Sequence, residues 1–388
     1  PGTFINDTWG QLEQFMSFID GGQLHRHVLS DHHPFFDTLF MGSFIIPLVK
    51  LTGAWHAVIF AYVLIQSFIT SLAFAYSVIY IYKKLNLGRL ITLVILFFYC
   101  IMPMYAASAQ TVSKDALFSW IYVLFFVFFM EIVRTNGNVL ADRSFLVKFI
   151  AAIVFCILTK KVGFYVVSIS IFILLISCLN NKKKLAICLI VTLCMMGLVM
   201  PGIRHILGVH SGGLQEMFSI PFQQTARYVK YHPDDITTNE RVVIDKVLGF
   251  NDLSQRYNPI SADPVKGYSQ KGSEKDYLNY LRVWAIQGSR HPGTYIDGFN
   301  AMTSGGFSFY KYNPLMNMSW HNQLDPNKIP EWVPVRNDFS EWTASSYQKA
   351  YDMTYRNPFF TIFLSYGFYA SIIPAFMIAT VLRKRRKT

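Results

Sequence analysis

The sequence predicts an all-α, multi-pass membrane protein, and two observations lead to this fold class. Of the 388 residues, 52% are hydrophobic and 15% are charged, whereas a soluble protein of this size carries about 25% charged residues. In addition, windows of about 20 apolar residues, the length needed to cross a bilayer, recur along the chain. These windows are too long for β-strands and do not alternate between apolar and polar residues.

The distribution of basic residues predicts how the chain threads the membrane. We expect spans at residues 55–82, 88–108, 113–133, 146–160, 162–180, 185–207 and 358–382. Lys and Arg gather in the loops after the first, third and fifth of these spans and in the C-terminal tail, and basic loops stay cytoplasmic. Because the chain starts at Pro1 rather than Met, we also expect at least one earlier span.

Four regions follow from this threading. They are an outer loop with interfacial helices (1–54), a transmembrane bundle (55–207), an extracytoplasmic cap (208–357), and a final span with a basic cytoplasmic tail (358–388). Residues 34–51 are apolar enough to span. A crossing there would carry Lys83 and Lys84 outside, so we expect this segment to lie in the interface.

Shorter patterns predict helices in the two outer regions. Residues 8–20 place apolar side chains at helical spacing, and Thr8 with Gln11 forms a capping box that puts Asp7 just before the first turn. In the cap, we expect helices near 214–231 and 274–290.

The net charge of +12 indicates a membrane partner and excludes nucleic acid. Residues 209–357 contain fifteen basic and fifteen acidic residues, so the excess belongs to the membrane half. A nucleic-acid binder would concentrate its positive charge on a soluble surface. Here the charge serves orientation and contact with anionic lipids.

Ionisable residues gather on the predicted outer face and are the candidate site, because such groups are costly at a bilayer. They come from the first loop, the start of the third span, the turn between the fourth and fifth spans, and the cap: Asp7, Asp31, His32, His33, Lys114, Asp115, Lys160, Lys161 and Arg227. Each also has a structural interpretation. The acids could lie at helix N-termini, the histidines at the interface, the lysines could snorkel, and Arg227 could be solvated.

Taken together, these residue types favour a lipid-phosphate substrate. Carboxylates can act as a general base or hold a divalent ion. Lys and Arg can hold a phosphate, and an adjacent apolar helix can hold a lipid chain. An acceptor hydroxyl would then arrive from the aqueous side, beneath the cap.

The sequence resembles the GT-C superfamily of membrane glycosyltransferases. The resemblance rests on Asp7, "SDHHP" before residue 35, "SKD" at the start of a span, the stretch "SIPFQQTAR", and the large late outer segment. Within that superfamily the chain is most similar to uncharacterised multi-pass proteins of Gram-positive bacteria.

The resemblance implies transfer of a sugar from a polyprenyl-phosphate donor to a cell-surface glycan or protein acceptor on the outer face of the plasma membrane. It further implies that Asp7 and Asp115 are catalytic and that Lys114 with Lys160 or Lys161 contacts the donor phosphate. Asp31, His32 and His33 would shape the site or bind the head group of the donor. Metal dependence stays open, a divalent cation being one option. Two other classes also stay open, a transporter or flippase of lipid-linked sugars and a non-catalytic cell-envelope assembly protein.

Overall fold

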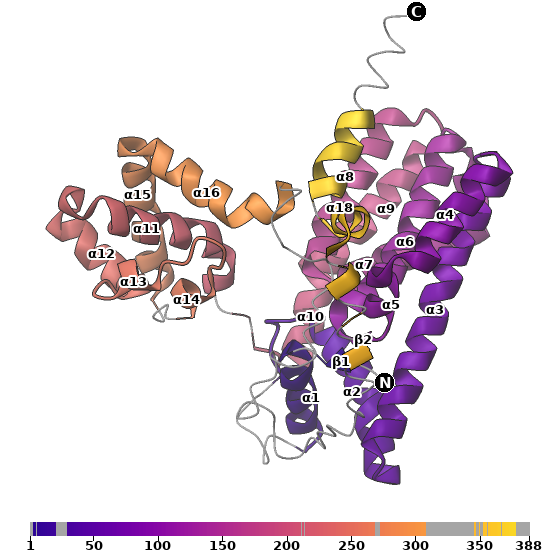
Figure 1. Cartoon of the computed structure of the whole chain (residues 1–388), viewed down its shortest axis with the longest axis horizontal. Helices are drawn as coiled ribbons and strands as arrows, with labels where there is room; N and C mark the ends of the chain where they lie inside the picture. Colours follow the sequence, from indigo (N-terminus) through magenta and orange to yellow (C-terminus); the bar gives the residue numbers. More distant parts are fainter. Residues whose placement is uncertain are drawn as a thin grey trace, which may run out of the picture. The chain divides into compact units, whose positions relative to one another are not determined.

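The protein is mainly helical, as a computed structural model shows (Figure 1). The structure describes residues 3–4, 6–20, 29–210, 212, 214–267, 272–307, 345–346, 349, 352–354, 356–365 and 367–377. The chain divides into two compact units, the first made of Pro1–Gly212 with Met318–Ser340 and the second of Gly213–Asn317 with Glu341–Thr388. Each unit has its own hydrophobic core.

The first unit contains ten α-helices within its described residues. They are α1 (Asn6–Ile19), α2 (Phe35–Thr52), α3 (Trp55–Lys83), α4 (Arg89–Ile101), α5 (Pro103–Ala109), α6 (Lys114–Arg134), α7 (Arg143–Thr159), α8 (Lys161–Ser177), α9 (Lys182–Cys194) and α10 (Met200–Ile206). A 3₁₀ turn, η1 (Asn138–Ala141), precedes α7, and a π-helical turn, η2 (Met195–Val199), joins α9 to α10. The helical prediction is confirmed. The described part adds one pair of two-residue strands, β1 (Thr3–Phe4) and β2 (Thr111–Val112).

Among the described residues, four helical segments are long and apolar enough to cross a membrane: Phe35–Thr52, Trp55–Lys83, Lys114–Arg134 and Lys182–Ile206. The predicted span 88–108 is instead a pair, α4 and α5, bent by 58°. The bend falls at Pro103, which cannot donate a backbone hydrogen bond to the preceding turn. If this pair counts as one span, five segments qualify. By length and composition α2 could cross the membrane as well, although we expected it at the interface.

The outward faces of these helices are apolar. Phe68 and Leu72 on α3 and Leu90 on α4 are 65%, 54% and 76% exposed, respectively. Side chains of this kind are buried in soluble proteins or covered by a partner or by lipid. This apolar surface is compatible with a membrane protein.

The loops rich in Lys and Arg meet at one end of the first unit. Tyr80, in the last turn of α3, donates a 3.0 Å hydrogen bond to Glu131, in the last turn of α6. The loop that follows α6 also binds the loop before α9, because Asn181 donates to the Gly137 carbonyl at 3.1 Å and Lys184 to the Leu140 carbonyl at 2.7 Å. The loop after α6 and the loop before α9 therefore lie together.

The second unit is a small helical module with its own core. Its described elements include η3 (Leu214–Phe218), α11 (Ser219–Tyr231), η4 (Pro233–Asp235), α12 (Thr238–Leu248), α13 (Leu253–Arg256), α14 (Asp263–Lys266), α15 (Glu274–Arg290), α16 (Pro292–Phe307), α18 (Pro358–Phe363) and η6 (Phe368–Ile372). Both predicted helices are confirmed, one matching α15 and the other α11 preceded by η3. The predicted span 358–382 is not continuous, because a turn at Leu364 separates α18 from η6. Residues 378–388 lie outside the described chain.

Candidate functional site

The site begins where the first strand pairs with the second. β1 and β2 are parallel, with Phe4 opposite Val112. Asp7 follows Phe4 by three residues and Lys114 follows Val112 by two, so this register brings both to the same end of the pair. Lys114 Nζ accordingly lies 2.8 Å from Asp7 Oδ2. Asp7 lies within the first turn of α1.

The capping box predicted at this helix start is wrong. Because α1 begins at Asn6, Thr8 already lies inside the helix, and its hydroxyl donates to the Val112 carbonyl. The Gln11 side chain donates to Thr38 on α2 at 3.2 Å. Both side chains therefore hold α1 against its neighbours instead of capping it.

His33 completes the group around Lys114. Its Nδ1 lies 2.7 Å from Lys114 Nζ and its Nε2 lies 3.7 Å from Asp7 Oδ2. An ammonium group can only donate, so Nδ1 must accept, and the proton of the neutral ring is assigned to Nε2, facing Asp7. The His32 ring packs edge-on against His33, with centroids 4.4 Å apart.

These contacts shift two pKa values. Burial, joined by the charge of Lys114, lowers the pKa of His33 to about 4. Burial by itself would raise the pKa of Asp7, but the hydrogen bond and charge of Lys114, with His33 and His32, hold that pKa below its ordinary value. At neutral pH the group is thus a carboxylate, an ammonium and a neutral imidazole.

Asp31 forms a second charged group beside the first. Its backbone N–H donates to the His210 carbonyl at 2.8 Å, which fixes the loop before α2 to the chain leaving α10. The Asp31 carboxylate is 3.0 Å from Arg204 and 3.6 Å from Lys161. Lys161 Nζ also donates to the backbone carbonyl of Asp31. The alternative that Asp31 caps α2 is wrong, because the N-cap is Pro34 and that helix has no side-chain cap.

The junction of α7 and α8 supplies the third pair. Lys160 has an extended backbone between the two helices, and its ammonium binds the Asp115 carboxylate in the first turn of α6. A side chain at Gly163 would place its Cβ only 2.1 Å from the Cys156 carbonyl oxygen. The turn that presents Lys160 and Lys161 is therefore too tight for any other residue at position 163.

Two residues of the site were not predicted. Arg204, at the end of an expected span, is the strongest partner of Asp31. Asp37 is fully buried in the first turn of α2 and lies within electrostatic range of Lys114, Asp115 and Lys160. Neither oxygen of its carboxylate has a hydrogen-bond partner among the described residues. One acid inside an 18-residue apolar run was the available signal.

Arg227 lies outside the first unit, which holds the other predicted site residues. It belongs to the second unit, where its guanidinium binds the Tyr257 hydroxyl at 3.0 Å and the Asp297 carboxylate at 3.2 Å. These partners hold the side chain against its own module, and the expectation that Arg227 gathers with the other candidates stays a prediction. Sequence periodicity gave no information on which core α11 would join.

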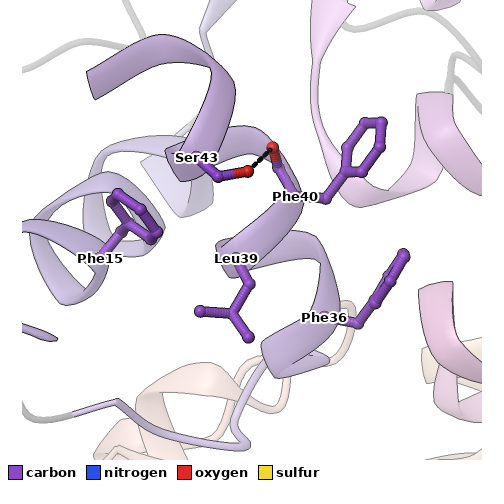
Figure 2. A pocket seen from close by; sticks show the side chains of 5 residues that line it. All are labelled: Phe15, Phe36, Leu39, Phe40 and Ser43. Carbon is purple, nitrogen blue, oxygen red and sulfur yellow. Dashed lines mark hydrogen bonds between the residues drawn. The ribbon is translucent and has the colours of Figure 1, made fainter. Parts of the chain in front are cut away.

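An apolar hollow lies on the helix that follows His33. Figure 2 shows Phe15 of α1 facing four residues of α2, namely Phe36, Leu39, Phe40 and Ser43. The hollow is open and holds about 340 Å³, at the small end of the range for ligand pockets. Phe36 is next to Asp37 in the sequence, so the hollow starts within one helical turn of the charged groups.

Within the described chain, the site thus combines four cations and the three acids that pair with them with an apolar surface. The cations are Lys114, Lys160, Lys161 and Arg204, and each binds one of the acids Asp7, Asp31 and Asp115. The acids face cations instead of one another, which is the arrangement of an anion site more than of a divalent-metal site.

Comparison with known proteins places the chain in a family without assigning an activity. No curated protein and no solved structure matches it. A family model matches residues 24–388, which leaves Asp7 and α1 before the matched region. The chain therefore belongs to the family of unknown function DUF6020.

Proposed function

We propose that this protein is a GT-C-type membrane glycosyltransferase that takes a sugar from a polyprenyl-phosphate donor. The observation that carries the proposal is the convergence of Asp7, Lys114 and His33 from segments far apart in the sequence. In this proposal the chain lies in the plasma membrane, with the site on the extracytoplasmic face and the basic loops in the cytoplasm.

The donor would bind with its phosphate among the cations and its lipid chain in the apolar hollow. Lys114 is 17% exposed, whereas Lys160 and Lys161 are 34% and 48% exposed. The two open lysines can meet an arriving phosphate first. A phosphate that then reaches Lys114 competes with Asp7 for the ammonium group.

This competition would activate the base. While Lys114 holds Asp7, the low pKa of the carboxylate makes it a weak proton acceptor. When the phosphate draws the ammonium away, the proton affinity of Asp7 rises. Asp7, with 43% of its side chain exposed, can then accept the proton of an acceptor hydroxyl.

The transfer step balances in charge and atoms. The acceptor oxygen forms a bond to the anomeric carbon as its proton passes to Asp7. The bond between that carbon and the phosphate oxygen breaks, and the electron pair leaves on the polyprenyl phosphate. Lys114, Lys160 and Lys161 stabilise the negative charge that develops on this leaving group.

Turnover of polyprenyl-phosphate hexoses by purified protein tests the proposal, with Asp7→Asn as the variant. Its matched control is Asp20→Asn, which removes the acid that directly follows the same helix and pairs with a lysine, Lys50 at 3.2 Å. We expect Asp7→Asn to lose at least about 100-fold in turnover and Asp20→Asn to retain activity. Full activity of Asp7→Asn refutes the role of the site.

Asp37 is the observation that favours a second candidate, a transporter or flippase of lipid-linked sugars. Buried ionisable groups in apolar helices often mark transport pathways. Asp37, however, lies in the first turn of α2, at the same end as Asp7 and Lys114. Substrate flux into liposomes without sugar transfer, sensitive to Asp37→Asn but not to Asp7→Asn, would select transport.

A further inference from the structure

Two helices of the second unit end in the same way. α11 ends at Tyr231, before His232 and Pro233, and α15 ends at Arg290, before His291 and Pro292. Proline disfavours a helical backbone in the residue before it. His232 (φ −134°, ψ 54°) and His291 (φ −130°, ψ 68°) accordingly share one non-helical conformation. Each imidazole therefore stands at a helix exit.

The two exits meet. The rings of His232 and His291 stack with centroids 3.8 Å apart and 21° between their planes. Asp235, in the 3₁₀ turn η4, lies beside both. Its Oδ2 is 2.8 Å from His291 Nε2 and 4.0 Å from His232 Nδ1. One ligand atom from each of the three residues lies within 4.8 Å of the other two.

We propose that His232, Asp235 and His291 bind a divalent transition-metal ion, with Zn²⁺ as the best fit. Metal–donor bonds of about 2.0–2.1 Å in tetrahedral geometry separate the donors by about 3.3 Å. The observed separations of 2.8 and 4.0 Å lie on either side of that value. Two imidazoles with one carboxylate suit Zn²⁺, whereas Mg²⁺ and Ca²⁺ prefer oxygen donors.

Thr294 contacts the ring nitrogen of His232 that faces away from the proposed metal position. Its hydroxyl lies 2.8 Å from His232 Nε2. Metal-bound histidines usually donate their second ring N–H to such a partner, which fixes the tautomer. Donation from Nε2 to Thr294 leaves the lone pair on Nδ1, the atom that faces Asp235. This orientation is the one that metal binding requires.

The ion would enter from solvent and keep an open position. The side chains of His232, Asp235 and His291 are 26%, 51% and 32% exposed. As the ion binds, the proton of His291 moves to Nδ1, so that Nε2 can exchange its hydrogen bond to Asp235 for a metal bond. Three protein donors leave a fourth position for water.

Binding of the ion would stabilise the second unit by linking two of its helices. The ion would join the C-terminal end of α11 to that of α15, next to the start of α16. Tyr228, whose ring centroid lies 5.4 and 5.5 Å from those of the two imidazoles, would be held against the stacked pair. The site stands on the second unit alone and does not depend on the proposed glycosyl transfer.

Calorimetric titration of Zn²⁺ into the chelator-treated full chain tests the proposal, with thermal unfolding as a second readout. We expect one tight equivalent and a higher unfolding midpoint. His232→Ala and Asp235→Asn should remove that equivalent, and His291→Gln, which can still hydrogen bond, should do the same without disturbing the fold. Thr294→Val should weaken binding by about 10–100-fold.

The controls separate this site from other histidines of the chain. Asp234→Asn changes the adjacent acid, and His56→Ala removes an exposed histidine of the first unit; both should keep the equivalent. Co²⁺ binding followed by visible absorption reports the donor set directly. Absence of tight Zn²⁺ binding by the parent chain, or equal binding by His232→Ala and the parent, would overturn the proposal.

Discussion

The ammonium group of Lys114 lies 2.8 Å from the carboxylate of Asp7, although 107 positions of sequence separate the two residues. Neither helix propensity nor apolar periodicity specifies this contact. It results from the parallel pairing of Thr3–Phe4 with Thr111–Val112. The site therefore depends on a tertiary contact that is only two residues long in each strand.

Replacement of Lys114 is expected to reduce transfer strongly. Lys114→Met removes the cation shared by Asp7 and His33 and so the charge that would stabilise the leaving phosphate. Loss of one such group costs about 10²–10³-fold in turnover. Lys50→Met, which breaks the exposed pair with Asp20, should have little effect. Equal rates for the two variants would exclude a role of Lys114 in the reaction.

His33 predicts a loss of stability in mild acid. Its folded pKa of about 4 lies below the ordinary value of 6.5, so between these pH values the unfolded chain binds more protons. Stability should therefore fall as pH drops from about 6.5 to 4, with a slope of up to about 1.4 kcal/mol per pH unit. Thermal midpoints of His33→Gln should be flatter in this window, and those of His56→Gln should follow the parent.

Asp7 predicts a second pH range, below that of His33, in which the stability of the fold depends on pH. Its folded pKa is held below the ordinary value of 3.8, so its stabilising contribution is present above that value and is lost as pH falls further. Asp7→Asn should remove the acid dependence below about pH 4 and leave the window of His33 largely intact. Loss of the His33 window as well in Asp7→Asn would show that the two groups titrate as one unit.

Arg204 and Asp31 are expected to be coupled in stability. Their carboxylate–guanidinium pair at 3.0 Å is partly buried, with side chains 12% and 28% exposed. In a double-mutant cycle of Asp31→Asn and Arg204→Gln, we expect a coupling energy of about 1–3 kcal/mol in unfolding free energy. Lys161 is present in every variant of the cycle. If the effects of the two substitutions are additive, Lys161 alone neutralises the charge of the Asp31 carboxylate.

Gly42 sets how closely α1 packs on α2. A Cβ atom there would lie 2.1 Å from the Phe15 ring, so Gly42→Ala should destabilise the chain by about 1–3 kcal/mol. Adding Phe15→Leu should recover part of the loss. Gly10→Ala on α1, with nothing within 4 Å of the added atom, is the control and should be neutral or slightly stabilising. An unchanged unfolding free energy for Gly42→Ala would contradict this packing.

We expect that Asp37 lowers the stability of the fold and is needed for turnover. A buried carboxylate without a hydrogen-bond partner costs free energy, so Asp37→Leu is expected to raise the unfolding midpoint. Because the acid lies within electrostatic range of Lys114 and Lys160, the same variant should lower turnover. Loss of stability would instead indicate a structural role, and unchanged turnover would remove Asp37 from the site.

Much of the helical structure was predictable because it depends on local properties of the chain. Apolar runs predicted α3 and α6 to within a residue or two, and the window 274–290 coincides with α15. The break of α4 from α5 at Pro103 was the exception, since the apolar window concealed the missing backbone donor. The prediction of a capping box at Thr8 was also wrong, because the Thr8 hydroxyl donates its hydrogen bond to the Val112 carbonyl and not to the backbone of its own helix.

The sequence by itself determined which residues carry charge at the ends of apolar helices, and so it identified Asp7, Lys114 and Asp115. Only the tertiary structure decided their partners, drew in Arg204 and Asp37, and held Arg227 in a different module. The reason is the distance along the sequence over which each kind of interaction acts. Hydrophobic periodicity acts within a few turns of helix, whereas the pairings of Asp7 with Lys114 and of Asp31 with Arg204 join side chains 107 and 173 positions apart.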